Sequence, residues 1–280
     1  MRFEKWQALG NDYLIVESDE LPWALTPARV RKLCDPHRGI GSDGVLLLEP
    51  SGDPAHVAAL RIFNPDGSEA ELSGNGSRQA MIYLRRRGRV ERDEFSILTA
   101  AGPISATITG PASAAIEMGH ATTRSKDYPT GPQDGRGELE ADGRAWRFQH
   151  VSIGNPQCAI ACEELEELDL PLIGPAIEHH PLFPNRTNVS WYRKLEPGVI
   201  RARIFERGAG ETLSSGTGAC GAAVAHHLAG GPRQIVVVLD GGELDVELDG
   251  ELGVTLTGWA VPICAGTLSE NFSKELNETQ

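Results

Sequence analysis

The stretch RIFNPDGSEAELSGNGSRQA occupies residues 61–80, and a related stretch, RIFERGAGETLSSGTGACGA, occupies residues 203–222. The two align without a gap at an offset of 203 − 61 = 142 residues. Of the 20 aligned positions, 8 are identical: Arg61/Arg203, Ile62/Ile204, Phe63/Phe205, Glu69/Glu211, Ser73/Ser215, Gly74/Gly216, Gly76/Gly218 and Ala80/Ala222. This agreement indicates an internal repeat, and therefore two half-domains built to one plan.

Each copy predicts the same local structure. A run of β-branched and aromatic residues predicts a strand, and the residues after Ser-Gly-x-Gly have the apolar spacing of a helix. Glycines allow the backbone to approach a ligand closely, and a helix start offers free N–H groups and a positive dipole end. A single Ser-Gly-x-Gly could be a plain turn, but two matched copies favour anion sites. We expect two helix starts that face each other across a cleft, with Ser73 and Ser215 at their tips.

The repeat extends over most of each half. Residues 152–155 (SIGN) echo residues 8–11 (ALGN), at an offset of 155 − 11 = 144. Many strand patterns with one long helix per half predict an α+β fold of two pseudo-symmetric domains, each a sheet wrapped around a central helix. We expect an N-terminal repeat domain at 1–120, a C-terminal repeat domain at 121–262, and a return segment with a polar, frayed tail at 263–280.

Composition excludes several classes of partner. A net charge of −13 argues against nucleic acid and anionic membrane surfaces. The first residues, MRFEKWQALGNDY, lack the apolar region of a signal peptide, and no apolar run reaches membrane-spanning length. The 5 scattered cysteines are typical of reduced thiols. We therefore expect a cytoplasmic protein that acts on a small molecule, and a homodimer would be ordinary for a metabolic enzyme of this size.

Two further patterns do not support a cofactor or a metal. Residues 39–44 (GIGSDG) match G-x-G-x-x-G but precede a predicted strand, whereas the dinucleotide-binding fingerprint follows a strand and opens a helix. The pairs His179-His180 and His226-His227 lack the spacing of metal ligands. We predict no metal and no cofactor.

Polar residues near the second tip suggest the chemistry. Glu206 and Arg207 precede Ser215, and Asn64 holds the position of Glu206 in the first copy (206 − 64 = 142). A substrate carboxylate held between opposed helix ends would have its α-carbon flanked on both faces. This geometry suits two-base chemistry, in which one group removes a proton and another returns it.

At these residues the chain resembles the diaminopimelate epimerase family of PLP-independent amino-acid racemases and epimerases. The motifs cover nearly the whole chain: ALGNDY at Ala8, GIGSDG at Gly39, FNPDGSE at Phe63, SGNGSR at Ser73, IGNPQ at Ile153, PNRTNV at Pro184 and ERGAGETLSSGTGA at Glu206. The resemblance implies an active site in an interdomain cleft. It also implies isomerase activity on LL- and meso-diaminopimelate, in lysine and cell-wall precursor synthesis.

The resemblance assigns roles to individual positions. It implies that the distal amino-acid end of the substrate is held by Asn64, Asn155, Asn188, Glu206 and Arg207, that Asn11 touches the substrate, and that the reacting carboxylate is cradled by Gly74, Asn75, Gly216 and Thr217.

The chain departs from the family pattern where the chemistry takes place. The family carries cysteine at the positions of Ser73 and Ser215, usually histidine at Gln157, and a further cysteine at Gln79. Four departures together favour natural divergence over a deliberate knock-out. A hydroxyl is much less acidic than a thiol, whose pKa is about 8.5, and needs a neighbouring base. We expect Ser73, Ser215, Glu206 and Gln157 to form the catalytic set, with Glu206 as that base.

The sequence leaves three functions open. The first is an epimerase that uses serines for proton transfer. The second is a related isomerase or dehydratase on another amino or carboxylic acid, with Glu206 as its base. The third is a pseudoenzyme that binds an amino acid without turning it over.

Overall fold

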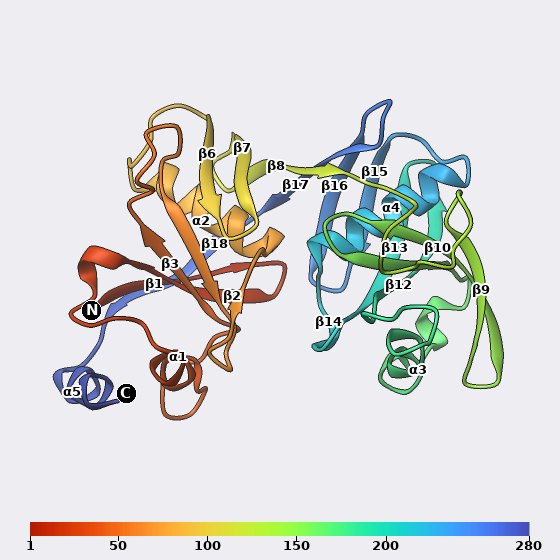
Figure 1. The fold of residues 1–280 in the computed structure, drawn as a ribbon. Helices are drawn as coiled ribbons and strands as arrows, with labels where there is room; N and C mark the ends of the chain where they lie inside the picture. The colour runs from red at the N-terminus through yellow and green to blue at the C-terminus, as the bar shows by residue number, and fades with distance from the viewer. Residues whose placement is uncertain (280) are drawn as a thin grey trace. The chain divides into compact units, whose positions relative to one another are not determined.

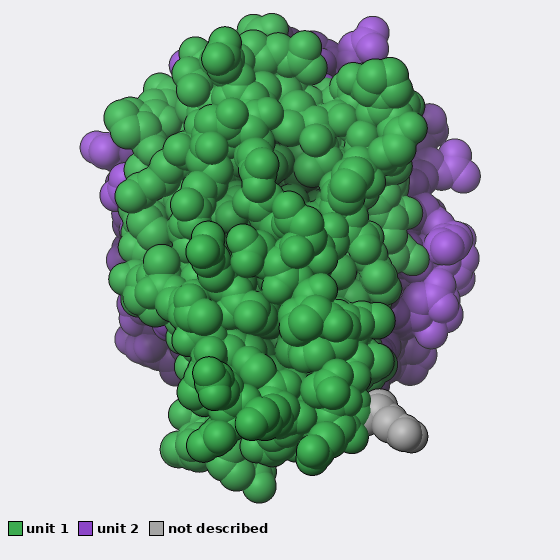
Figure 2. Space-filling view, turned by 90° about the vertical axis from the view of Figure 1, so that its left-hand side faces the viewer, with its two compact units in different colours: residues 1–116, 258–280 green, residues 117–257 purple. Residues whose placement is uncertain are grey.

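The computed structural model describes residues 1–279, which form two compact units. Unit 1 comprises Met1–Ile116 and the segment from Gly258 onward, and unit 2 comprises Glu117–Thr257 (Figure 2). In each unit strands surround one long helix: α2 (Gly74–Arg86) in unit 1 and α4 (Gly216–Leu228) in unit 2 (Figure 1). The predicted α+β class is confirmed. Within residues 1–279, no helix combines the length and apolar character needed to cross a membrane.

The remaining elements fall into two similar sets. Unit 1 contains β1 (Arg2–Ala8), β2 (Asn11–Glu17), η1 (Ser18–Glu20), α1 (Pro27–Cys34), β3 (Val45–Glu49), β4 (Ala59–Phe63), β5 (Glu69–Ala70), β6 (Glu94–Thr99), β7 (Gly102–Gly110), β18 (Val261–Thr267) and α5 (Glu270–Glu278). Unit 2 contains β9 (Arg136–Ala141), β10 (Arg144–Ser152), β11 (Pro156–Ala161), η2 (Leu165–Glu167), α3 (Leu170–Glu178), β12 (Asn188–Glu196), β13 (Val199–Glu206), β14 (Gly210–Thr212), β15 (Gln234–Leu239) and β16 (Gly242–Leu248). The strands β8 (Ser113–His120) and β17 (Gly253–Trp259) contain residues of both units.

The sequence repeat is also a repeat of structure. In unit 1, β4 pairs antiparallel with β5, and Arg61 Nε lies 2.8 Å from Glu69 Oε1 across the hairpin. In unit 2, β13 pairs with β14 in the same way, and Arg203 Nη2 lies 2.6 Å from Glu211 Oε1. Both long helices contain 13 residues. The predicted duplication is confirmed.

Each long helix begins at a serine. Ser73 has an extended backbone, with φ −140°, and its Oγ accepts a hydrogen bond of 3.0 Å from the Gly76 N–H. Ser215, with φ −137°, accepts one of 3.2 Å from the Gly218 N–H. Each hydroxyl thus satisfies one of the donors that a first turn leaves without an intrahelical partner. The predicted helix starts are confirmed.

The glycine-rich motif at residues 39–44 serves packing, as its position before β3 suggests. A Cβ on Gly44 would lie 2.2 Å from the Phe63 carbonyl oxygen and 2.7 Å from the Tyr13 ring. No side chain fits there, so glycine is required for the close approach of the backbone to β4. The motif leads into β3 and opens no helix, unlike a dinucleotide-binding loop.

The prediction of a frayed tail is wrong. Residues Glu270–Glu278 form α5, whose N-cap Ser269 accepts a hydrogen bond of 3.2 Å from the Phe272 N–H. Leu268 and Phe272 pack against an apolar cluster that includes Val30 and Leu33 of α1, and Leu276 is fully buried in that cluster. The spacing of four residues places these apolar side chains on one face of a helix, which the polar composition conceals.

This packing makes α5 part of the stability of unit 1. We expect Leu276→Ala to lower the free energy of unfolding by about 2–4 kcal/mol, because a buried side chain leaves a cavity. Leu172→Ala makes the same change at a side chain that is 62% exposed, and should cost less than about 0.5 kcal/mol. Denaturant unfolding measures both. If both variants lowered the free energy of unfolding by the same small amount, α5 would not be packed stably against unit 1.

Candidate active site

The start of α4 joins a hydroxyl to a carboxylate. Ser215 is 4% exposed, and its Oγ donates a hydrogen bond of 2.9 Å to Glu206 Oε2. The second carboxylate oxygen, Glu206 Oε1, accepts one of 2.8 Å from Thr212 Oγ1. Glu206 ends β13 and Thr212 ends β14, so the hairpin of the repeat holds the acid beside the helix tip. A proton can pass from Ser215 directly to Glu206.

The surroundings of Glu206 make it a better base than an ordinary glutamate. Burial raises the pKa of its carboxyl because the charged form loses solvation. The hydroxyls of Thr212 and Ser215 act in the opposite direction and lower that pKa, since they donate to the carboxylate, but burial prevails. A raised pKa brings the carboxylate closer to the range in which general bases work at neutral pH.

The start of α2 has different chemistry. The Tyr13 hydroxyl donates a hydrogen bond of 3.4 Å to Ser73 Oγ, and Ser73 is half-buried. Asn64, which holds the repeat position of Glu206, donates from Nδ2 to Ser68 Oγ at 3.0 Å. The first tip therefore has a phenol where the second has a carboxylate. Sequence reasoning missed Tyr13, because no local pattern links residue 13 to residue 73.

Two side chains fix the turn that carries Asn11. Asp43 Oδ2 accepts hydrogen bonds of 2.9 Å from Asn11 Nδ2 and 2.9 Å from the Asp12 N–H. Gln79 Nε2 donates to the Asn11 carbonyl oxygen at 3.0 Å. Asp43 belongs to the glycine-rich motif, so this motif and α2 together hold the predicted contact residue. Asp43 itself was not predicted to contribute.

The residues predicted to bind the reacting carboxylate lie in the first turns of the two long helices. Gly74 and Asn75 are buried at the start of α2, and the Asn75 side chain accepts a hydrogen bond from Arg78. Gly216 is buried at the start of α4, and Thr217 is half-buried beside it. Backbone N–H groups and the positive dipole end at these positions favour an anion.

Two amide side chains form a series of hydrogen bonds that ends at the start of α4. Gln157 Nε2 donates to Asn155 Oδ1 at 2.8 Å, and Asn155 Nδ2 donates to Thr217 Oγ1 at 3.2 Å. Gln157 is fully buried, and its Oε1 has no hydrogen-bond partner within the described residues. Gln157 was predicted to belong to the catalytic set. Because an amide does not titrate near neutrality, it can contribute there only through hydrogen bonds, and the one that it donates orients Asn155.

Two buried side chains accept hydrogen bonds from backbone N–H groups of the loop after Glu206. Asn188 Oδ1 accepts a hydrogen bond of 2.8 Å from the Arg207 N–H. Glu178, which is 4% exposed, accepts one of 3.0 Å from the Gly208 N–H through Oε1. Arg207 is itself exposed and donates from Nη1 to the Asn185 carbonyl oxygen at 3.0 Å. Sequence reasoning missed Glu178, which is 30 residues away from this loop.

The histidine pairs have other partners. His226 packs edge-on against Tyr192, with ring centroids 6.3 Å apart, and His179 Nδ1 lies 3.1 Å from the Pro175 carbonyl oxygen. Among residues 1–279, no three His, Cys, Asp or Glu side chains are grouped in a way that could hold a metal ion.

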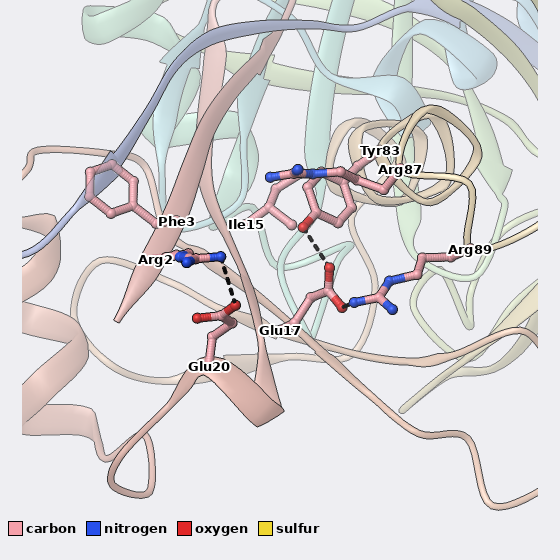
Figure 3. Close-up of a pocket in the computed structure, with 8 residues that line it drawn as sticks. All are labelled: Arg2, Phe3, Ile15, Glu17, Glu20, Tyr83, Arg87 and Arg89. Atoms are coloured by element: carbon pink, nitrogen blue, oxygen red, sulfur yellow. Dashed lines mark hydrogen bonds and ion pairs between the residues drawn. The ribbon is translucent and has the colours of Figure 1, made fainter.

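Unit 1 also contains a cavity of about 230 Å³, whose lining residues are drawn in Figure 3. It adjoins Tyr83 and Arg87 at the end of α2, whereas Ser73 stands at the start of that helix. The Tyr83 hydroxyl donates to Glu17 Oε1 at 2.8 Å, and Arg89 forms an ion pair with the same carboxylate. Arg2 forms an ion pair with Glu20, and Arg87 forms one with Glu4, which does not line the cavity. None of the predicted site residues lines this cavity, so it is not part of the candidate site.

Known proteins share both the sequence and the fold. The model of the family described as diaminopimelate epimerase matches residues 3–124 and 149–261. The chain is 40% identical to the diaminopimelate epimerase of Synechococcus sp. (strain JA-3-3Ab), over 96% of this chain and 99% of that protein. It is 39% identical to the diaminopimelate epimerase of Pelotomaculum thermopropionicum, over 95% of this chain and 98% of that protein.

Solved structures of lower identity share the fold. A hydroxyproline epimerase from Agrobacterium vitis superposes with a TM-score of 0.69 at 19% identity, covering 95% of this chain and 91% of its own. A phenazine biosynthesis protein of the PhzF family from Bacillus anthracis gives 0.68 at 18% identity, covering 96% and 99%. The family match and the close relatives decide the assignment: the chain belongs to the diaminopimelate epimerase family of isomerases.

Proposed function

We propose that the protein interconverts LL- and meso-2,6-diaminopimelate by two-base proton transfer at the α-carbon, without PLP. The observation that carries the proposal is the 2.9 Å hydrogen bond from Ser215 to Glu206, because it supplies the base that a serine needs. The names of the relatives support the substrate, and the family supports the type of reaction.

In the step proposed for Ser215, the Cα–H bond of the substrate breaks and its electron pair stays on carbon. The proton passes to Ser215 Oγ, while the proton of Ser215 passes to Glu206 Oε2. Ser73 then donates its own proton to the opposite face of the carbanion and takes one from the Tyr13 hydroxyl, 3.4 Å away. Glu206 is then protonated and Tyr13 deprotonated, and exchange of a proton with water restores each of them. The reverse reaction uses the same groups in the opposite order.

The remaining predicted residues supply binding. Helix N–H groups at Gly74, Asn75, Gly216 and Thr217 would stabilise the carboxylate as negative charge develops beside it. The distal end would be held by Asn64, Asn155, Asn188 and Arg207, with Gln157 orienting Asn155 and Asn11 touching the substrate. The hydrogen bond from Ser215 to Glu206 supports the role of Glu206 as the general base. We give this role precedence over a contact of Glu206 with the distal end of the substrate.

Chiral chromatography of a reaction started from LL-diaminopimelate tests this function. We expect meso-diaminopimelate to accumulate to a constant ratio, unchanged by added PLP or by a metal chelator. A product of different mass would point to a related isomerase or dehydratase. Binding by calorimetry without any product would point to a pseudoenzyme.

We also infer a cytoplasmic homodimer that binds neither nucleic acid nor membrane. The free cysteines suit a reducing compartment, and the net charge of −13 opposes anionic partners. For the dimer, the support is β18, which pairs with β1 and exposes Ile263, Cys264 and Ala265. An exposed apolar strand without charged residues is a surface on which a second copy can pair.

Light scattering after size-exclusion chromatography tests the dimer. We expect the wild type to elute at twice the chain mass and Ile263→Lys to elute as a monomer, because a lysine at an edge strand opposes pairing. Ile263 is 54% exposed, so folding should survive the change. The control is Leu195→Lys, at a side chain that is 45% exposed on β12. A monomeric wild type, or a dimeric Ile263→Lys, contradicts the inference.

A further inference from the structure

We propose that Thr212 is a positioning residue for Glu206: its hydroxyl holds one carboxylate oxygen so that the other faces Ser215. The consequence for catalysis rests on the function proposed above, whereas the positioning itself does not.

The contacts of the carboxylate carry the first step. Glu206 Oε1 accepts from Thr212 Oγ1 at 2.8 Å, and Glu206 Oε2 accepts from Ser215 Oγ at 2.9 Å. The two donors come from different elements, because Thr212 ends β14 and Ser215 caps α4. The terminal torsion of a glutamate is soft. One donor alone would leave the carboxylate free to rotate about that torsion, and two donors fix its plane.

The other half of the repeat supplies an internal comparison. Ala70 stands at the position of Thr212 (212 − 70 = 142), and Asn64 stands at that of Glu206. Unit 1 keeps the hairpin and the ion pair across it, so neither needs a hydroxyl at this position. The hydroxyl occurs in the half that has the acid. This pattern points to a role toward Glu206 and away from the general stability of the hairpin.

The charged groups around Glu206 are engaged elsewhere. Arg207 donates to the Asn185 carbonyl oxygen, and Glu178 accepts from the Gly208 N–H and from Arg186. Within residues 1–279, no ion pair to Glu206 is present. The two hydroxyls are therefore the groups that counteract burial and keep the pKa of Glu206 from rising further.

The test is the titration of Glu206 itself, followed by carbon NMR in the full-length protein labelled with ¹³C-glutamate and assigned with Glu206→Gln. We expect Thr212→Val to raise the pKa of Glu206 by about half a unit to one unit, because a hydroxyl donor to the charged form is lost. The acidic limb of the epimerase pH profile should move to higher pH by the same amount. The variant should lower kcat, whereas its KM should change less. Thr212→Ser, which keeps the hydroxyl, should restore both.

The control is Thr255→Val, the same change on β17, which should leave the titration as in the wild type. Should Thr212→Val fail to fold, Thr212→Ala is measured in the same way. An unchanged pKa of Glu206 in a folded Thr212 variant overturns the proposal, as does a shift that Thr212→Ser reproduces. If the wild type shows no epimerisation but the titration shifts, the proposed function fails and the positioning role stands.

Discussion

Glu206→Gln is expected to lower kcat/KM for epimerisation by about 10²–10⁴-fold, the range of a positioned general base. The reason is the chemistry of the hydroxyl at Ser215. A serine is too weak an acid to exchange its proton unaided, and Glu206 Oε2, 2.9 Å away, is placed to accept that proton. An amide at the same position cannot accept it. Initial rates from LL-diaminopimelate measure the effect.

Glu206→Gln also tests how the epimerisation rate depends on pH, because the acidic limb of the pH profile should be absent from this variant. Glu206 must be deprotonated to act, so activity falls as the pH drops through its pKa. Burial raises that pKa, so the loss should occur at a higher pH than for an ordinary glutamate. Glu211→Gln is the matched control: it removes a carboxylate from the same hairpin, but one that pairs with Arg203. It should retain the acidic limb. Equal rates in Glu206→Gln and the wild type would exclude Glu206 as the base.

The second large effect is a gain. Ser73→Cys/Ser215→Cys is expected to raise the epimerisation rate by at least about 100-fold, because a thiol with pKa about 8.5 exchanges protons far more readily than a hydroxyl. The helix start assists, since its dipole and N–H groups favour a thiolate. Each serine also caps its helix, so each substitution by cysteine should lower the free energy of unfolding by about 1 kcal/mol.

The single variants serve as controls for the gain. A proton must move on both faces of the α-carbon, so Ser73→Cys or Ser215→Cys alone should gain much less than the pair. Ser214→Cys places a thiol one residue from the tip and should gain nothing. A double variant no faster than the wild type would mean that the serine positions do not present their side chains to the substrate α-carbon.

The part of this architecture that the sequence predicts is the part that repeats. Residues 61–80 and 203–222 carry their strand, turn and helix start as local patterns of strand formers, glycines and a capping serine, and all of these were found. The short second strand of each hairpin was not predicted. That Asn64 and Glu206 hold equivalent positions could also be predicted, because residues 61–80 and 203–222 align without a gap. Family resemblance, by contrast, supplied the substrate and the roles of the binding residues.

The groups that the sequence did not reveal act over long separations. Tyr13 meets Ser73 across 60 residues, and Asp43 meets Asn11 across 32. Such contacts depend on how strands stack and leave no periodic pattern. Thr212 is a nearer case: it lies within the repeat, but its importance emerges only when its hydroxyl is seen on Glu206. The sequence of α5 contains apolar residues at intervals of four, Leu268, Phe272 and Leu276, but the many polar residues between them concealed the helical pattern.

The central claim is that Ser73 and Ser215 transfer the α-proton of diaminopimelate. The most direct measurement is mass spectrometry of the substrate after incubation with the protein in deuterated water, beside Ser73→Ala/Ser215→Ala. We predict incorporation of deuterium at the α-carbon with the wild type and none with the double variant. No incorporation with the wild type, or equal incorporation with both proteins, would contradict the claim.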